Sequence, residues 1–163
     1  MYRVLPLDPA TDRAGFSCGN DALDRYFRER VTQDIRRRVA SCFVALDDGG
    51  RMAGFYTLAA ASVLLVDLPE VIGRKLPRYP SIPAVRMGRL AVDRSARGQG
   101  LGAALLADAL ARSMASEIAA YALVVDAKDD EAQRFYEHHG FMLLARHPRS
   151  LFLPFATARG ALR

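Results

Sequence analysis

A glycine-rich hexapeptide, Arg97-Gly98-Gln99-Gly100-Leu101-Gly102, has the clearest chemical potential in this sequence. It lies between a stretch typical of a strand and one typical of the first turn of a helix. The first N–H groups of a helix have no acceptor within the helix, and they carry the positive end of its dipole. Because glycines have no side chain, an anion can reach these groups. The hexapeptide therefore predicts a site for a phosphate or a pyrophosphate.

Three kinds of phosphate ligand compete for such a loop. No Lys-Ser or Lys-Thr pair follows the glycines, which excludes the phosphate loop of nucleoside triphosphatases. Gly98, Gly100 and Ala103 satisfy the dinucleotide pattern G-x-G-x-x-A, and Asp126 follows at a suitable distance. Against a dinucleotide, residues 93–97 separate strand from glycine, and the 37 residues after Asp126 are too few for a doubly wound sheet. The third ligand is coenzyme A, and the loop alone does not decide.

Tyr136 is a second candidate for chemistry. A phenol of ordinary pKa about 10 can protonate a departing thiolate. Composition alone would favour a tyrosine packed in the core beside Phe135. His138 and His139 flank Gly140 near a predicted helix end, where a surface role is expected.

No carboxylate or histidine stands out as a general base. This matters for the choice of amine, because a lysine amine of pKa about 10.4 must lose a proton at neutral pH. An α-amine of pKa about 7.7 is already substantially neutral there. The sequence thus leans toward an α-amine acceptor, and it predicts no metal site.

The elements that must position these residues follow from periodicity and turn residues. Apolar residues recur every fourth position at Leu23, Phe27, Val31 and Ile35, which predicts an amphipathic helix. Further helices are expected from Leu101 and over 131–139, the latter capped by Asp129 or Asp130. Strands are expected at 2–7, 42–46, 52–58, 84–92, 122–125, 141–144 and 151–155, and a long basic loop with room for one short helix at 66–83. Early hairpins and later helical crossovers predict an α/β domain with a mixed sheet.

Length and composition limit the organisation of the chain. With 163 residues, 51% of them apolar, we expect a single domain over 1–163. Pro6 and Asp8 interrupt the start before an apolar stretch of signal-peptide length develops, so export is not expected. The longest uncharged run, 52–66, is shorter than the roughly 20 residues that cross a bilayer. Only Cys18 and Cys42 occur, without the spacing of a disulfide framework or metal site, which fits a reduced cytosol.

Two motifs resemble those of the GNAT N-acetyltransferases. Their pyrophosphate loop, Q/R-x-x-G-x-G/A, is matched by Arg97, Gly100 and Gly102, and the preceding 87–93 looks like the family's fourth strand. Residues 129–141 resemble the family's N-x-x-A-x-x-F-Y-x-x-x-G-F helix, with Asp129 in place of the usual Asn. Two motifs at the correct separation are more specific than either alone.

The resemblance implies a GNAT fold, with a mixed central sheet flanked by helices and central strands that splay apart over 85–92 and 121–126. It implies acetyl-coenzyme A as cofactor, its pantetheine arm paired with backbone near Leu90 and Val92. Tyr136 takes the position of the proton donor, and a backbone N–H on the splayed strand that of the oxyanion donor. The implied cofactor-binding residues are Leu90, Ala91, Val92, Arg97, Gly98, Gln99, Gly100, Leu101, Gly102, Asp129, Ala132 and Phe135.

Segments over most of the chain are similar to the acetyltransferase toxins of bacterial toxin–antitoxin modules. They are 16–24, 54–58, 76–80, 88–92 and 125–129. Members of that group acetylate the amino acid of charged transfer RNA and are silenced by a small ribbon-helix-helix antitoxin. The resemblance thus implies an aminoacyl-tRNA substrate, such an antitoxin, a homodimer and a cytoplasmic location away from membranes. A small-molecule or protein N-acetyltransferase and a non-catalytic acyl-coenzyme A sensor remain alternatives.

Two clusters of cations are candidates to meet RNA phosphates. The net charge is +5, and 21 of the 23 basic residues are arginine. Affinity for transfer RNA needs clustered cations. A solvated helix end and an arginine-rich loop without a ligand explain the same residues equally well. The candidates are Arg36, Arg37, Arg38, Arg74, Lys75 and Arg78.

Overall fold

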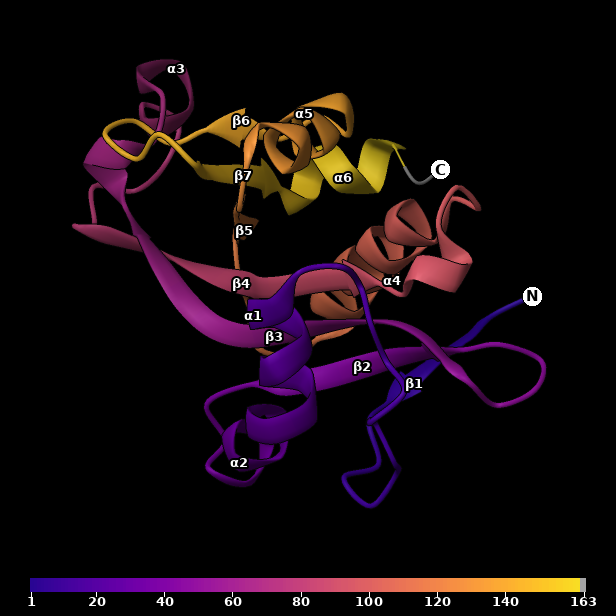
Figure 1. Cartoon of the computed structure of the whole chain (residues 1–163). Coiled ribbons are helices and arrows are strands. Elements are labelled where there is room, and N and C mark those ends of the chain that lie inside the picture. The colour runs from indigo at the N-terminus through magenta and orange to yellow at the C-terminus, as the bar shows by residue number, and fades with distance from the viewer. Residues whose placement is uncertain (162–163) are drawn as a thin grey trace. The chain divides into compact units, whose positions relative to one another are not determined.

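The computed structural model describes residues 1–161, which form two compact units, each built from separate stretches of chain. The first unit contains Met1–Ala59 and Gly88–Ala111, and the second contains Ala60–Met87 and the chain from Arg112 onward. Figure 1 shows the elements of both units, coloured by their order along the chain. The strands are β1 (Arg3–Pro6), β2 (Ser41–Leu46), β3 (Met52–Leu64), β4 (Ser81–Val92), β5 (Ala122–Asp126), β6 (Met142–Leu143) and β7 (Ser150–Pro154).

The helical segments of the described residues are α-helices and short turns of other helix types. The single turns are a π turn, η1 (Tyr26–Arg30), and the 3₁₀ turns η2 (Leu65–Asp67) and η3 (Arg94–Ala96). The α-helices are α1 (Asp21–Arg25), α2 (Val31–Arg36), α3 (Glu70–Gly73), α4 (Leu101–Ala115), α5 (Asp130–His138) and α6 (Phe155–Ala161). None of the helices in the described residues is long and apolar enough to span a membrane.

The sheet is mixed, and its strands follow the order β1-β2-β3-β4-β5-β7-β6. β1, β2 and β3 pair antiparallel, whereas β4 pairs parallel with β5 and β5 antiparallel with β7. The pairing of β4 with β5 covers Ala84–Met87 against Ala122–Val125, so it ends before Leu90, as a splayed strand requires. The predicted mixed α/β sheet flanked by helices is confirmed.

In the first unit, aromatic side chains form the centre of the core. The rings of Phe27 and Phe55 stack at a centroid distance of 4.2 Å, and the ring of Phe16 meets Phe27 edge-on at 4.9 Å. The helix predicted through Leu23 and Ile35 is present as α1, η1 and α2 in succession. Asn20 caps it by accepting a hydrogen bond from the Leu23 amide at 3.0 Å.

In the second unit, the buried strand β5 is central. Val124 and Phe152 belong to its core, together with Leu144 from the chain that follows β6. The expected antiparallel pair near the C-terminal end is confirmed as β6 and β7, although β6 has only two residues. The strand predicted over 151–155 is wrong at its end: Pro154 closes β7, and Phe155 begins a helix, α6, that periodicity did not predict.

Candidate active site

The glycine loop has the backbone conformation of an anion cradle. Gly98 and Gly100 both adopt φ of +76°, a left-handed conformation that side-chain-bearing residues rarely adopt. A Cβ atom placed on either would meet no other heavy atom within 4 Å. The space beside both glycines is therefore open, and a ligand can approach the main chain there.

Unpaired amides at the start of α4 face the same loop. Ala104 is the residue whose N–H donates to the Gly100 carbonyl, at 3.1 Å. Because helical bonds join each N–H to a carbonyl four residues earlier, the amides of Leu101, Gly102 and Ala103 have no acceptor within this 15-residue helix. These amides and the dipole of α4 suit a diphosphate. The residues present thus fit the diphosphate of coenzyme A.

A buried carboxylate, Asp93, fixes the entrance to the loop. It accepts hydrogen bonds from the amides of Ser17 at 2.9 Å and Ser95 at 3.0 Å, and from the Ser95 hydroxyl at 2.6 Å. Burial raises the pKa of Asp93, but these hydrogen bonds and the Arg51 guanidinium outweigh it, so the pKa lies below its usual value. This role was not predicted from the sequence, although Asp two residues before Ser at a strand end is a recognisable turn signal.

The side chains of the loop contact the N-terminal part of the same unit. The Arg97 guanidinium donates to the Cys18 carbonyl, and the hydroxyl of Tyr2 donates to the side-chain oxygen of Gln99. These hydrogen bonds tie Arg97 and Gln99 to the N-terminal part of the unit, although both residues are exposed. In β4, Ala91 is buried in the core, while Leu90 and Val92 are half-buried.

Tyr136 lies on α5 in the second unit, and its ring is buried. Its ring centroid lies 5.3 Å from that of Phe135 and 5.5 Å from that of Phe141. Burial raises the pKa of Tyr136, and the nearby Asp126 carboxylate raises this pKa further. The phenol is therefore protonated at neutral pH and can act only as a proton donor there.

The other candidates on α5 shape the start of the helix. The Asp129 carboxylate caps α5 by accepting a hydrogen bond from the Ala132 amide at 2.8 Å. This confirms a cap at Asp129 and explains why Asp can stand where Asn is usual, since both side chains accept the same bond. At the other end, His139 packs edge-on against Phe135 at 4.8 Å, and burial, with a contribution from His138, lowers its pKa.

Comparison with known proteins decides the family. The model of the acetyltransferase (GNAT) domain family matches residues 38–143, which is more than half of the chain. The chain belongs to the GNAT acetyltransferases. A relative from Mycobacterium tuberculosis, a "tRNA-acetylating toxin", is 38% identical over 158 residues, spanning 96% of this chain and 93% of that protein. By class, the chain is an N-acetyltransferase.

Solved structures of the GNAT toxin AtaT resemble this acetyltransferase along its whole length. AtaT in complex with acetyl-methionyl-tRNAfMet is 29% identical with a TM-score of 0.88, and the match covers 100% of both chains. A mutant of AtaT bound to acetyl-CoA and to the C-terminus of the antitoxin AtaR is 26% identical with a TM-score of 0.79, covering 99% of this chain and 98% of that one.

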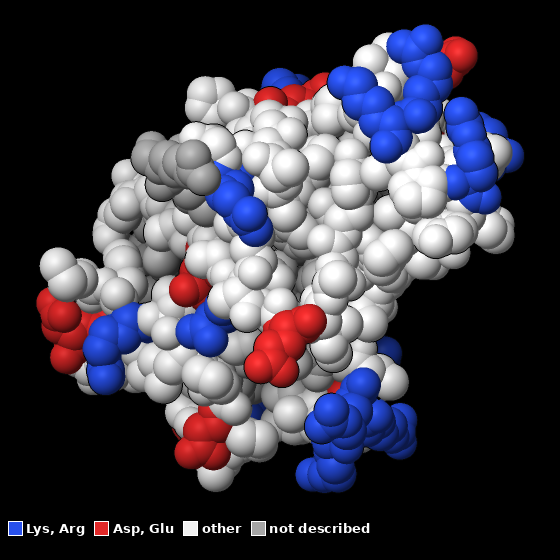
Figure 2. Space-filling view, turned by 180° about the vertical axis from the view of Figure 1, so that it is seen from behind, with Lys and Arg blue, Asp and Glu red and all other residues white. Residues whose placement is uncertain are grey.

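The two predicted cation clusters of the acetyltransferase are exposed. Arg36, Arg37 and Arg38 follow one another at the C-terminal end of α2, and Arg38 has a φ of +60°. Arg74, Lys75 and Arg78 follow α3 in the second unit. Figure 2 shows blue side chains gathered at the upper right, over the α3 part of the second unit, with little red among them.

A hollow of about 470 Å³ brings Arg37 together with two arginines that the sequence analysis missed. Arg30 and Arg89 line it, along with Tyr26 and Asp34. The Arg89 guanidinium lies 3.5 Å from the Tyr26 ring centroid, and the Tyr26 hydroxyl donates to Asp34 at 2.8 Å. The contact between Arg89 and Tyr26 joins β4 to the π turn, and no spacing in the sequence predicts it.

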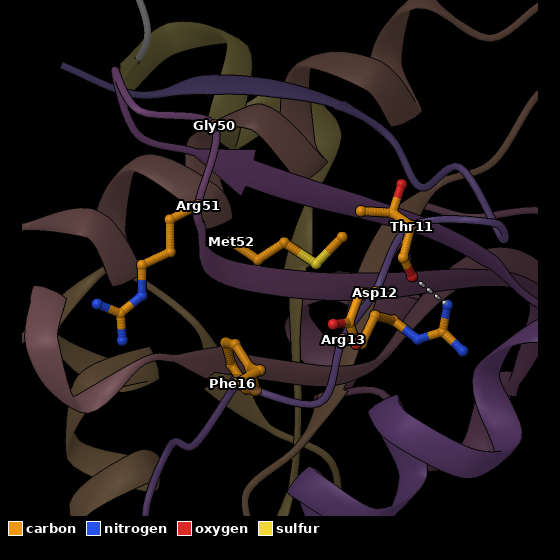
Figure 3. Close-up of a pocket in the computed structure, with 8 residues that line it drawn as sticks. Thr11, Asp12, Arg13, Phe16, Gly50, Arg51 and Met52 are labelled. Carbon is orange, nitrogen blue, oxygen red and sulfur yellow. Dashed lines mark hydrogen bonds between the residues drawn. The ribbon is translucent and has the colours of Figure 1, made fainter.

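A second hollow, of about 220 Å³, contains none of the predicted site residues. It lies between the β2–β3 turn and residues 11–16, with Arg13, Arg51 and Met52 among its lining (Figure 3). Arg13 is already engaged, since its Nε donates to the Phe27 carbonyl at 2.7 Å, and Arg51 pairs with Asp93 at 3.5 Å. These cations therefore stabilise the unit. Within residues 1–161, no group of His, Cys, Asp or Glu could hold a metal ion.

Proposed function

We propose that this enzyme transfers the acetyl group of acetyl-coenzyme A to the α-amine of aminoacyl-tRNA, and that it acts as a toxin by blocking translation. One observation carries the proposal: the chain is similar over nearly its full length to a tRNA-acetylating toxin and to AtaT, whose complex contains acetyl-methionyl-tRNAfMet. An acetylated α-amine cannot attack a peptidyl ester, so the charged tRNA is lost for elongation.

The donor, acetyl-coenzyme A, supplies a thioester whose acetyl carbon is open to attack by an amine. In our proposal the amides from Gly98 to Gly102 hold its diphosphate, supported by the open cradle and the unpaired amides at the start of α4. Backbone groups of Leu90, Ala91 and Val92 pair with the pantetheine arm, and one of their N–H groups stabilises the oxyanion. On the resemblance of α5 to the family motif, Asp129, Ala132 and Phe135 are further proposed cofactor contacts.

Tyr136 is the proposed proton donor to the departing thiolate. Its raised pKa supports this role, because the phenol keeps its proton until it meets a stronger base. Burial also raises the proton affinity of a thiolate, so donor and acceptor shift in the same direction. The amine needs no separate base, since an α-amine of pKa about 7.7 already has a substantial neutral fraction near neutral pH, unlike a lysine amine.

The proposal extends to the partners of the enzyme. A ribbon-helix-helix antitoxin would silence it; the related toxin AtaT is bound to the C-terminus of the antitoxin AtaR in a solved structure. We propose that the enzyme works as a homodimer in the cytoplasm, where charged tRNA is found. Arg36, Arg37 and Arg38, and separately Arg74, Lys75 and Arg78, would meet tRNA phosphates.

Expression without an antitoxin tests this function. We expect growth arrest and, by mass spectrometry of aminoacyl-tRNA from the arrested cells, an acetyl group on the esterified amino acid. A matched control is the Tyr136→Phe variant, which should permit growth. If cells grow without acetylated RNA while purified protein acetylates small amines or protein N-termini, the acceptor is wrong. If Tyr136→Phe arrests growth as strongly as wild type, Tyr136 is not the proton donor.

A further inference from the structure

The segment between α3 and β4 holds an exposed aromatic side chain among cations. Tyr79 has 64% of its surface exposed, which is unusual for so large a ring. Arg74, Lys75 and Arg78 lie one to five residues away and are exposed as well. Among the described residues, none of these three cations is in an ion pair. Both charge and ring are thus free for a ligand.

Acidic groups of the segment cancel little of this charge. Residues 66–83 contain only two acids, Asp67 and Glu70. Asp67 is buried and already paired with Arg146 at 2.7 Å and His147 at 2.9 Å. Glu70 lies in the first turn of α3, where it complements the helix dipole. The segment therefore presents net positive charge to a ligand, as the blue group in Figure 2 shows.

The backbone around Tyr79 is held in place before any ligand binds. Pro80 restricts the backbone of the preceding Tyr79 to extended conformations, and Pro77 does the same for Leu76. The Leu65 amide donates to the Pro80 carbonyl at 3.1 Å, which fastens the end of the segment to η2. Leu76 packs against the core of the second unit. A backbone that is already held in place loses little entropy on binding.

We infer that Tyr79 stacks on an unpaired nucleotide of the RNA substrate while Arg74, Lys75 and Arg78 meet the adjacent phosphates. Bases expose their faces only where the strand is unpaired, and proteins recognise such bases by stacking aromatic rings on them. An aromatic ring among free cations is suited to single-stranded RNA, whereas duplex RNA would use only the cations. This inference rests on the proposed function, because it assumes that RNA is the acceptor.

Binding of RNA without any acetyl transfer tests the inference. The probe is an uncharged hairpin with the sequence of a tRNA acceptor stem, with its unpaired 3′ end or with a blunt end. We expect the overhang to bind more tightly, Tyr79→Ala to lose roughly tenfold or more in affinity, and Tyr79→Phe to stay within about twofold. Val71→Ala, which trims an exposed side chain of the neighbouring α3, is the matched control and should bind like wild type.

Two further readouts separate stacking from charge. The chain contains no Trp, so Tyr79→Trp introduces a single reporter whose fluorescence should be quenched by the overhang hairpin and not by the blunt one. Arg78→Gln should reduce the slope of log affinity against log salt by about one, whereas Arg159→Gln on α6 should leave it unchanged.

Failure of this inference can be distinguished from failure of the proposed function. If Tyr79→Ala loses RNA affinity but wild type acetylates no aminoacyl-tRNA, the stacking site stands and the acceptor is wrong. If Tyr79→Ala binds both hairpins as wild type does, the inference is overturned, even where acetylation of aminoacyl-tRNA is established. A Tyr79→Ala variant that changes only self-association or antitoxin binding overturns it too, since the surface would then be a protein interface.

Discussion

At the scale of single residues, the proposed acetyl transfer depends on a buried phenol. Tyr136 is surrounded by Phe135 and Phe141, and its raised pKa keeps it protonated. The sequence identified this tyrosine only through its motif. From the composition of the chain and the neighbouring residues alone, Tyr136 would have been assigned to the core, and the structure shows that it is indeed buried. Burial and proton donation are therefore compatible, because burial is what keeps the proton on the ring.

The first prediction concerns this proton. Tyr136→Phe should lower kcat by roughly 10²- to 10⁴-fold, because the thiolate loses its acid. The affinity for acetyl-coenzyme A, measured by calorimetry, should change less than about threefold, since the ring stays in place. Tyr121→Phe is a suitable control: Tyr121 is a half-buried tyrosine of the same unit, and its loss of a hydroxyl should leave kcat unchanged.

The second prediction concerns the pH dependence of single-turnover rates. The rate should rise with pH through the pKa of the α-amine, about 7.7, because only the neutral amine attacks. It should then stay level through about pH 10, since the raised pKa of Tyr136 keeps the phenol protonated beyond the usual value. An RNA hairpin carrying the amino acid in amide linkage avoids hydrolysis at high pH. A descending limb near pH 9 would show that another acid donates the proton.

At the scale of elements, Gly54 sets how closely β3 and α4 approach. A Cβ atom on Gly54 would lie 2.8 Å from Leu105 and 3.0 Å from the Ala91 carbonyl oxygen. The glycine is needed for space and not for its backbone angle. The packing of α4 on β3 holds the helix that begins at the glycine loop, so this contact supports the proposed cofactor site.

The third prediction follows from that contact. Gly54→Ala should lower the free energy of unfolding by about 1–3 kcal/mol and weaken acetyl-coenzyme A binding, because the backbone oxygen of Ala91 cannot move aside. Gly15→Ala is the matched control, since a Cβ there meets nothing within 4 Å. Urea unfolding of both variants measures the difference. Equal stability of Gly54→Ala and wild type would show that α4 can shift without cost.

The sequence predicted best those elements that depend on residues close to one another along the chain. The hairpin of β2 and β3, the cap at Asp129 and the start of α4 depend on neighbouring residues, and all three were predicted correctly. The π turn within the first helix was not, because apolar spacing of four residues describes α and π turns alike. The stacking of Arg89 on Tyr26 was also missed, since it joins residues 63 positions apart.

At the scale of the whole molecule, stability and acid sensitivity depend on buried carboxylates. In the second unit, Asp67 accepts hydrogen bonds from Arg146 and His147, both at the β6–β7 connection. Burial raises the pKa of Asp67, but the hydrogen bonds from Arg146 and His147 and the Arg146 charge outweigh it, so the pKa lies below the usual value. A lowered pKa adds stability above the unfolded pKa of about 3.9, and this stability is lost as pH falls through the folded value.

The fourth prediction uses this linkage. Asp67→Asn should destabilise the protein at pH 7, and the loss should shrink as pH falls below about 4, because wild type then loses the same charge. Asp48→Asn is the control: Asp48 is highly exposed and pairs with the N-terminal amine at 3.5 Å. Urea unfolding across pH measures both. A difference between wild type and Asp67→Asn that stays constant with pH would contradict the role of the Asp67 charge.

The enzyme as a whole is best tested by one transfer reaction. Purified protein is incubated with acetyl-coenzyme A and a pool of aminoacyl-tRNA, and the amino acids released from the RNA are analysed by mass spectrometry. We expect at least one amino acid to gain a single acetyl group on its α-nitrogen, dependent on both acetyl-coenzyme A and Tyr136. Release of every amino acid unmodified, while the same protein acetylates free amines, would contradict the account.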